Sequence, residues 1–293
     1  MTREPGAADL RLDPRYVRRT LKEAGLHARH SMGQNFLSDV DVLEGILREA
    51  APGPGRGVLE IGPGLGFLTG GLIAAGATVT AVELDRGLAA FLLDVYAADI
   101  EAGRLRLVEG DALDQDLSNL VAAPYDVVAN LPYQITSPIL HRLLGKAPRA
   151  QRLVLMVQRE VAERIAAAPG DMSYLSVFVQ YHARARIALF VKPDSFEPAP
   201  KVSSAVIVLE PYDTDDRLDA AAEDALWRVV QAGFRERRKM LHNVLRRQLP
   251  IEADRVDAAL AAVGIAPDRR PQTLAVGEWI ALVEALGPMT GAG

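Results

Sequence analysis

The chain has 293 residues, of which 49% are hydrophobic and 24% are charged. This composition is typical of globular proteins and excludes disordered, collagen-like and disulfide-rich classes. The chain contains no cysteine, which excludes disulfides, thiolate metal ligands and every mechanism with a cysteine nucleophile. No apolar run approaches about 18 residues, and the N-terminus carries acids and prolines where a signal peptide needs an apolar core. We therefore expect a cytoplasmic protein without a membrane span.

The net charge of −5 argues by itself against a polyanionic partner, but the charges are unevenly placed. Residues 11–32 hold six cations and two acids, and residues 233–247 hold six cations and one acid. Residues 211–224 carry six acids and one arginine. This shift in composition predicts a domain boundary, with one domain over residues 1–211 and a second over residues 212–293.

Short apolar runs alternate with helix-compatible stretches up to the acidic segment. The predicted strands cover residues 58–61, 78–82, 105–108, 126–129, 153–157, 185–191 and 203–209. Helices are predicted between them at residues 67–75, 86–98, 137–145 and 158–168. Continuous Val, Ile and Leu runs separated by helices indicate a mostly parallel sheet in a doubly wound α/β domain.

The last two predicted strands have no helix between them, which predicts an antiparallel final strand. Beyond the acidic segment the pattern is helical, at residues 217–232, 235–248, 253–263 and 277–286. The sequence thus predicts a small helical domain after the α/β domain.

A glycine-rich turn follows the first predicted strand of the sheet, with Gly62, Gly64 and Gly66 in the sequence VLEIGPGLGF. Glycines in a strand-to-helix turn let the backbone approach a nucleotide-like ligand closely. Glu83 ends the next strand, about where an acid can accept hydrogen bonds from ribose hydroxyls, and Asp111 ends the third. Because ligands of such sheets bind beyond the carboxyl ends of the strands, these elements predict one crevice.

The spacing of the glycines leaves two adenosine-containing cofactors open. A dinucleotide fold usually shows GxGxxG because a helix N-terminus must reach a pyrophosphate. Here the spacing is GxGxG, and a second acid suits the adenine amine. Both features favour S-adenosylmethionine, which has no phosphate.

The fourth strand ends in NLPYQITSP, residues 130–138. This arrangement is typical of enzymes that methylate exocyclic amines of bases. The amine's lone pair is delocalised into the ring, and it becomes nucleophilic when acceptors hold both hydrogens out of the plane. The Asn130 side-chain oxygen and a backbone carbonyl from Leu131 or Pro132 can supply those acceptors, and Tyr133 can stack on the base. The sequence therefore predicts Asn130, Leu131, Pro132 and Tyr133 as catalytic residues.

These motifs and the later ones resemble the ribosomal RNA adenine dimethyltransferases of the KsgA/RsmA type, relatives of the Erm enzymes, over nearly the whole chain. The segments that carry the resemblance are HSMGQNFL (residues 30–37), VLEIGPGLGFLT, VELD, EGDAL, NLPYQITSPIL, MVQREVAERI, SFEPAPKVSSAVIVLE, GFRERRKMLHN and RPQTLAVGEW. The family usually has Tyr-Gly where this chain has Met172 and Ser173. The resemblance implies a Rossmann-like methyltransferase domain with a seven-stranded sheet.

The resemblance also implies roles for individual residues. Gln34, Asn35 and Leu37 would cover the cofactor, and Phe196 would stack on the adenine opposite Tyr133. The remaining cofactor-binding residues would be Gly62, Gly64 and Gly66 at the methionine part, Glu83 at the ribose, Asp111 at the adenine, and Asn130. The implied substrate is two adjacent adenosines near the 3′ end of 16S rRNA, each dimethylated within an immature small subunit by a monomeric enzyme.

Cations and histidines outside the motifs have plainer interpretations. Arg235, Arg237, Arg238 and Lys239 are predicted at the start of a helix as rRNA phosphate contacts, the alternative being a solvated face. Arg15, Arg18, Arg19 and Lys22 lie at helical spacing near the N-terminus, where both interpretations stay open. The five histidines form no ligand set, so we expect no metal site.

Three other functions compete with the leading one. An Erm-like methylase of 23S rRNA is disfavoured by GFRERRK and RPQTLAVGEW, and a non-catalytic ribosome-assembly factor is disfavoured by the intact site residues. A dehydrogenase is the weakest alternative because of the glycine spacing.

Overall fold

The computed structural model describes residues 12–29, 32–212 and 218–289. Arg11 of the N-terminal basic segment and His30 and Ser31 of the HSMGQNFL motif lie outside the described residues, as do residues 213–217 of the acidic segment. Contacts between Cα atoms divide the chain into two compact units. One unit comprises residues 1–162 and 184–211, and the other comprises residues 163–183 and 212–293.

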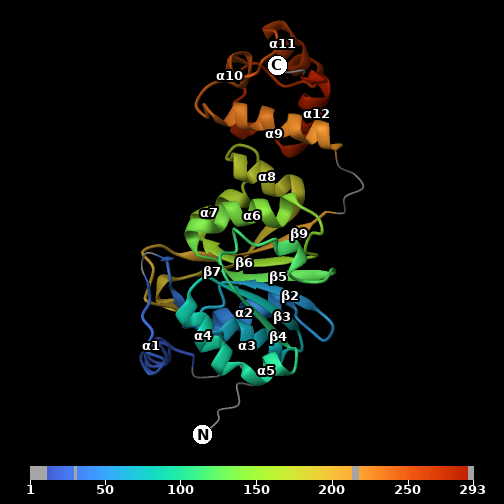
Figure 1. Cartoon of the computed structure of the whole chain (residues 1–293). Coiled ribbons are helices and arrows are strands. Elements are labelled where there is room, and N and C mark those ends of the chain that lie inside the picture. Colours follow the sequence, from blue (N-terminus) through green and yellow to red (C-terminus); the bar gives the residue numbers. More distant parts are fainter. Residues whose placement is uncertain (1–11, 30–31, 213–217, 290–293) are drawn as a thin grey trace. The chain divides into compact units, whose positions relative to one another are not determined.

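The first unit is built on a seven-stranded sheet in the order β4-β3-β2-β5-β6-β9-β7 (Figure 1). Its strands are β2 (Gly57–Ile61), β3 (Thr78–Glu83), β4 (Leu105–Glu109), β5 (Tyr125–Asn130), β6 (Leu153–Gln158), β7 (Ala183–Val191) and β9 (Ser204–Pro211). All seven strands predicted from apolar runs are confirmed. The doubly wound α/β fold is confirmed with them.

Four of the strand pairings are parallel, which places the carboxyl ends of β2, β3, β4, β5 and β6 at one edge of the sheet. β9 runs antiparallel to β6, with Gln158 opposite Ser204, as the missing helix before it predicts. Chain order reverses between β2 and β5, since β2 lies between β3 and β5. Such a switch point is where open α/β sheets bind their ligands.

Helices in this unit connect the strands and precede the sheet (Figure 1). They are α1 (Pro14–Glu23), α2 (Val40–Ala50), α3 (Phe67–Ala74), α4 (Arg86–Val95), α5 (Ala97–Glu101), α6 (Thr136–Gly145) and the start of α7 (Arg159–Ile165). Side chains at their caps explain several boundaries. The Asp13, Asp39 and Asp85 carboxylates accept backbone N–H groups at the first turns of α1, α2 and α4.

A second, two-stranded sheet pairs β1 (Phe36–Leu37) with β8 (Phe196–Glu197) in antiparallel fashion. Leu37 lies opposite Phe196, and both side chains are buried in the hydrophobic core of the unit. This pairing joins the segment before α2 to the segment before β9. It brings an N-terminal motif and a late motif of the sequence to one place.

The helical unit contains α8 (Tyr174–His182), α9 (Ala220–Phe234), α10 (Leu241–Gln248), α11 (Ala253–Ala262) and α12 (Val276–Leu286). Their apolar faces form a separate core around the fully buried Trp279. Met172 is buried in this core, and Ser173 caps α8 through a hydrogen bond from the Ser176 backbone N–H. The departure from the family at these two positions therefore lies at a helix start in the helical unit.

The prediction of one helix over residues 235–248 is wrong. Arg235, Arg237 and Arg238 lie in a turn after α9, Lys239 follows them, and α10 begins at Leu241. The Leu241 backbone N–H donates to the Arg269 carbonyl oxygen at 2.8 Å instead of to a preceding helical turn. This tertiary hydrogen bond separates the two helices. In the part of the chain that the structure describes, no helix is long and apolar enough to cross a membrane.

Candidate active site

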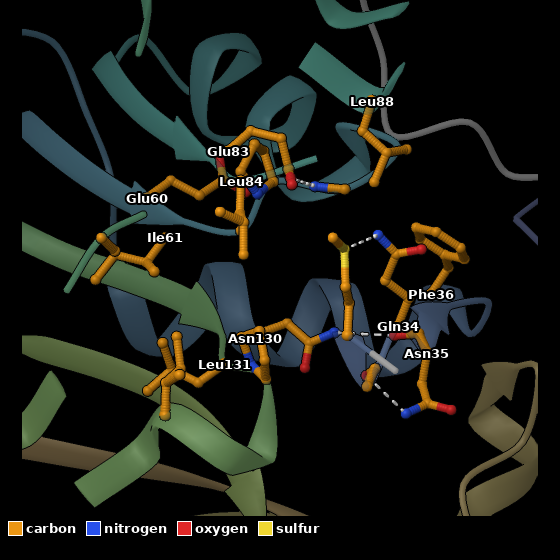
Figure 2. Close-up of a pocket in the computed structure, with 18 of the residues that line it drawn as sticks. Gln34, Asn35, Phe36, Glu60, Ile61, Glu83, Leu84, Leu88, Asn130 and Leu131 are labelled. Carbon is orange, nitrogen blue, oxygen red and sulfur yellow. Dashed lines mark hydrogen bonds between the residues drawn. The ribbon is translucent and has the colours of Figure 1, made fainter. Parts of the chain in front are cut away.

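A cavity of about 260 Å³ lies in the α/β unit at the carboxyl ends of β2, β3 and β5. Figure 2 shows Glu60, Glu83 and Asn130 on one side of this cavity and Gln34, Asn35 and Phe36 on the other. The lining contains every predicted catalytic and cofactor-binding residue except Gly66. Gly66 is the residue that caps the start of α3, next to the lining residues Leu65 and Phe67.

The glycine turn needs glycine for conformational and steric reasons. Gly62, Gly64 and Gly66 have φ values of 69°, 60° and 83°, in the left-handed region that side chains rarely adopt. A Cβ on Gly66 would lie 2.7 Å from the Tyr96 ring, whose hydroxyl donates to the Gly66 carbonyl oxygen. Tyr96 therefore holds the turn at Gly66, while Gly62 and Gly64 line the cavity.

Glu83 ends β3 beside the glycine turn and supports it. Its carboxylate oxygens accept hydrogen bonds from the Gly64 backbone N–H at 3.1 Å and the Asp85 backbone N–H at 2.8 Å. Burial raises the pKa of Glu83, partly offset by these hydrogen bonds. Asp111 follows β4, lines the cavity and accepts from the Leu113 backbone N–H. The two predicted acids thus lie at successive strand ends around one cavity.

Glu60 is a third carboxyl group in the lining, and the sequence pattern predicts only that it lies in a strand. It is 1% exposed, and its carboxylate accepts a hydrogen bond of 2.6 Å from the buried Thr69 hydroxyl on α3. Burial raises its pKa to about 8, with a smaller contribution from the negative charge of Glu83. A charged residue inside the apolar run VLEI is the signal that could have identified it.

The N-terminal segment closes one side of the cavity through Gln34 and Asn35. The Gln34 side chain accepts from the Arg29 backbone N–H at 2.8 Å and donates to the Asp85 carboxylate at 3.1 Å. Asp85 also forms an ion pair with Arg29 at 3.3 Å. Because both ends of the Gln34 amide are engaged, this residue holds the segment against the start of α4.

Asn130 lies at the end of β5 with its side chain in the cavity (Figure 2). Its amide nitrogen donates to the Asn35 carbonyl oxygen at 3.4 Å. This hydrogen bond orients the amide so that Oδ1 is left to accept from another group. The Asn130 side chain is therefore placed to accept a hydrogen bond from a ligand's amine.

The backbone after Asn130 differs in its two carbonyl groups. The Pro132 carbonyl oxygen accepts from the Ile135 backbone N–H at 3.1 Å. No hydrogen bond to the Leu131 carbonyl oxygen occurs within residues 12–29, 32–212 and 218–289, whereas the Leu131 N–H donates to Met156. Of the two carbonyls that the motif offers, that of Leu131 is the more available acceptor.

Two aromatic side chains line the same cavity. The Tyr133 hydroxyl is 2.7 Å from the Ser204 hydroxyl, which anchors the ring to the start of β9, and burial raises the pKa of Tyr133. Phe196, 2% exposed, reaches the cavity from β8. The Ser195 hydroxyl donates to Asp39 at 2.7 Å, and Arg18 forms an ion pair with Glu197 at 2.5 Å. The segment that carries Phe196 is thus fastened to α1 and to the start of α2.

The predicted phosphate contacts belong to the helical unit and are absent from the cavity lining. Arg235, Arg237, Arg238 and Lys239 are all exposed. Arg235 donates to the Gln248 side chain, and Arg237 donates to the Met172 carbonyl oxygen at 3.4 Å. Their role in binding rRNA stays a prediction.

The chemistry of the lining restricts the ligand. Three carboxyl groups, four side-chain amides and many apolar side chains line the cavity, and no Lys or Arg is among the lining residues that the structure describes. This set suits a ligand with hydroxyl, amine and cationic groups, and it offers no counter-ion to a pyrophosphate. Among the described residues no cluster of His, Asp or Glu could hold a metal ion.

Sequence comparison finds one family and close relatives over most of the chain. A sequence model of the family described as ribosomal RNA adenine dimethylase matches residues 25–287. A protein named "Ribosomal RNA small subunit methyltransferase A" from Synechococcus sp. (strain RCC307) is 43% identical over 274 residues, covering 90% of this chain and 98% of the relative. The protein of that name from Moorella thermoacetica is also 43% identical, covering 91% of this chain and 95% of the relative.

Solved structures share the fold. A dimethyladenosine transferase from Plasmodium falciparum superposes with a TM-score of 0.72 at 25% identity, covering 84% of this chain and 95% of that one. The 23S rRNA methyltransferase ErmE superposes with a TM-score of 0.68 at 28% identity, covering 86% of this chain and 99% of that one. The lower identity to ErmE than to the small-subunit methyltransferases disfavours the Erm-like alternative.

Proposed function

The chain belongs to the ribosomal RNA adenine dimethylase family, and from this membership we propose its substrate, its cofactor site and its catalytic residues. The enzyme is an rRNA adenine methyltransferase, and it dimethylates the N6 amines of two adjacent adenosines near the 3′ end of 16S rRNA. We place this reaction on the immature small subunit and in the cytoplasm, with the enzyme acting as a monomer.

The observation that carries the proposal is the orientation of Asn130. Its amide nitrogen is used by the Asn35 carbonyl oxygen, so Oδ1 can accept one hydrogen of the adenine amine. The Leu131 carbonyl oxygen would accept the other, since that of Pro132 is used by Ile135. Two acceptors at a strand end hold both amine hydrogens and direct the nitrogen lone pair toward the cavity. Orientation of this kind can lower the activation free energy by up to about 7 to 11 kcal/mol.

Methyltransferases of this family and fold use S-adenosylmethionine, and the cavity fits it. Glu83 would accept from the ribose hydroxyls, Asp111 would accept from the adenine amine, and the glycine turn would lie against the methionine part. Gln34, Asn35 and Leu37 would cover the other side. When bound, this cofactor supplies an electrophilic methyl group on a sulfonium centre. The absence of Lys and Arg among the described lining residues agrees with a ligand that lacks phosphate.

Tyr133 and Phe196 would hold the target base between their rings. Bases in a single-stranded loop can leave the stack at low cost, and each aromatic stack contributes about 1 to 3 kcal/mol. The Tyr133 hydroxyl is held by Ser204, so the ring's position does not depend on the substrate. We expect a base in this clamp to present its amine to Asn130 and Leu131.

Labelled S-adenosylmethionine and small subunits from an unmethylated strain test the proposal, with the modified bases mapped afterwards. The wild type should label two adjacent adenosines in 16S rRNA. Asn130→Ala should lower kcat at least about 100-fold, the effect of a misplaced reacting group, while subunit binding stays within about twofold. The exposed Asn119 provides a matched control, because Asn119→Ala removes an amide outside the cavity.

Other outcomes would contradict specific parts of the proposal. Unchanged turnover in Asn130→Ala would refute the mechanism. Labelling of 23S rRNA instead would favour the Erm-like function, and subunit binding without transfer by the wild type would favour a non-catalytic assembly factor.

A further inference from the structure

Phe190 is an exposed aromatic side chain near the end of β7, in the α/β unit. It is 55% exposed, the largest exposed fraction among the large hydrophobic residues of the described chain. The Arg159 guanidinium lies over the ring, 4.9 Å from its centroid. Because Arg159 lies over one face, a stacking partner would have to contact the other face.

A series of contacts links this ring to a residue of the active site. The Arg159 backbone N–H donates to the Ser203 carbonyl oxygen at 2.9 Å, and the next residue, Ser204, contacts the Tyr133 hydroxyl at 2.7 Å. β9 lies between β6 and β7 in the sheet, so Arg159 after β6 and Phe190 on β7 flank the start of β9. Phe190 thus contacts Arg159, Arg159 is bonded to Ser203, and the adjacent Ser204 contacts the proposed base-stacking Tyr133.

The segments next to Phe190 and Arg159 in the chain carry exposed cations. Lys192 follows β7, Lys201 precedes β9, and Arg159 itself is exposed. Exposed acids on the same segments include Glu160, Glu163 and Asp194. An exposed aromatic ring with an Arg guanidinium over one face and an exposed Lys two residues along the chain suits a nucleotide, whose base stacks and whose phosphate is attracted by the cations.

We propose that Phe190, backed by Arg159, is a stacking site for an rRNA base that neighbours the target adenosine. The partner is single-stranded RNA continuous with the strand whose adenosine enters the cavity. Binding one neighbouring base would fix the backbone on one side of the target and favour extrusion of the adenosine. The inference rests on the proposed function, because it requires that an adenosine in a single-stranded loop enters this cavity.

Steady-state kinetics on unmethylated small subunits test the proposal with full-length enzyme. Phe190→Ala and Phe190→Leu should each raise the KM for the subunit about 5- to 150-fold, the range that corresponds to one base–aromatic stack. The kcat and the affinity for S-adenosylmethionine should stay within about twofold, because Phe190 is not in the cavity lining. Phe190→Trp, which keeps a stacking ring, should restore the KM. Phe190→Leu keeps an apolar side chain, so a rise in KM there cannot be assigned to unfolding.

Leu93 provides the matched control, because it is also an exposed hydrophobic residue, 51% exposed, but lies on α4. Leu93→Ala should leave the KM unchanged. An unchanged KM in Phe190→Ala and Phe190→Leu would overturn the proposal, as would an equal rise in Leu93→Ala.

Photo-crosslinking identifies the partner directly. With p-benzoylphenylalanine in place of Phe190, the crosslink should map to an rRNA nucleotide in the same loop as the methylated adenosines. A crosslink to a ribosomal protein would overturn the proposal in favour of a protein contact. Measuring the wild type in parallel distinguishes a failure of the proposed function from a failure of the proposed stacking site. A wild type that transfers no methyl group refutes the proposed function, whereas normal methylation with unaltered kinetics in the Phe190 variants refutes only the stacking site.

Discussion

At the scale of single residues, the carboxyl groups around the cavity differ in how they are held. Glu83 accepts two backbone N–H groups, whereas Glu60 has one hydroxyl donor and is almost fully buried. Burial therefore raises the pKa of Glu60 to about 8. The folded protein thus holds a proton on Glu60 that the unfolded chain releases above its ordinary pKa of 4.5.

This proton makes stability depend on pH in a defined direction. Between the ordinary pKa and the raised one, the folded state binds more protons than the unfolded state, so raising the pH favours unfolding. We expect Glu60→Gln, which keeps a hydrogen-bond acceptor for Thr69, to gain stability relative to the wild type as pH rises from about 5 to 8. The gain should be at most about 1.4 kcal/mol per pH unit and should level off above a pH of about 8.

Denaturant unfolding at several pH values measures this difference. Glu44→Gln on α2 controls for the loss of one charge, because Glu44 is exposed. A stability difference between Glu60→Gln and the wild type that stays constant over the range from about pH 5 to 8 would show that Glu60 is ionised throughout.

Whether a site residue could be predicted from the sequence depends on its position along a strand. Glu83, Asp111 and Asn130 follow apolar runs, and parallel strands bring such ends together, so sequence alone could group them. Glu60 lies inside a strand, and alternation does not say which face of a doubly covered sheet meets the ligand. The acceptor choice between Leu131 and Pro132 depends on the hydrogen bond from Ile135, which only the backbone geometry reveals.

At the scale of elements, the segment that carries Phe196 is held by parts of the chain about 160 residues earlier. β8 pairs with β1, and Arg18 of α1 forms an ion pair with Glu197. Arg18 thus helps to hold the segment that carries Phe196, whereas Arg19 contacts Glu23 of its own helix at 4.0 Å. The choice between phosphate contact and a solvated helix face stays open for the N-terminal cations.

We expect Arg18→Ala to lower kcat/KM on small subunits about two- to fivefold, since an exposed ion pair contributes little and only the position of Phe196 is loosened. The affinity for S-adenosylmethionine should not change. Arg19→Ala, which removes a cation from the same helix, should leave kcat/KM within experimental error. Equal reductions in both variants would assign the effect to helix charge rather than to the Glu197 ion pair.

Sequence patterns predicted the long elements and missed the short non-local ones. The strands of the main sheet are continuous apolar runs, so each could be identified locally. β1 and β8 have two residues each and exist through their mutual pairing, which has no local pattern. α10 begins at Leu241 because a hydrogen bond to Arg269 intervenes, and the helical pattern of residues 235–240 gives no sign of it.

At the scale of the whole molecule, contacts group Glu163–Ala183 with the C-terminal helices rather than with the sheet. The sequence prediction has one boundary near residue 211, because only the acidic segment changes the composition. Residues 163–183 carry apolar side chains, including Met172 and Val177, that pack in the helical core. Helical periodicity shows that such a segment buries one face, but not which of two cores it joins.

The net charge of −5 is a poor guide to RNA binding, because exposed cations gather in the turn between α9 and α10. Neutralising Arg238 and Lys239 together should weaken subunit binding and reduce the slope of log K against log salt by about 0.7 to 0.9 for each phosphate that the variant no longer neutralises. Arg246→Ala is the control, since Arg246 is paired with Asp257 and contributes less unbalanced charge. Filter binding over a salt series gives both slopes. An unaltered slope in Arg238→Ala/Lys239→Ala would return these cations to a solvated face, and local charge would then no longer explain how an acidic protein binds rRNA.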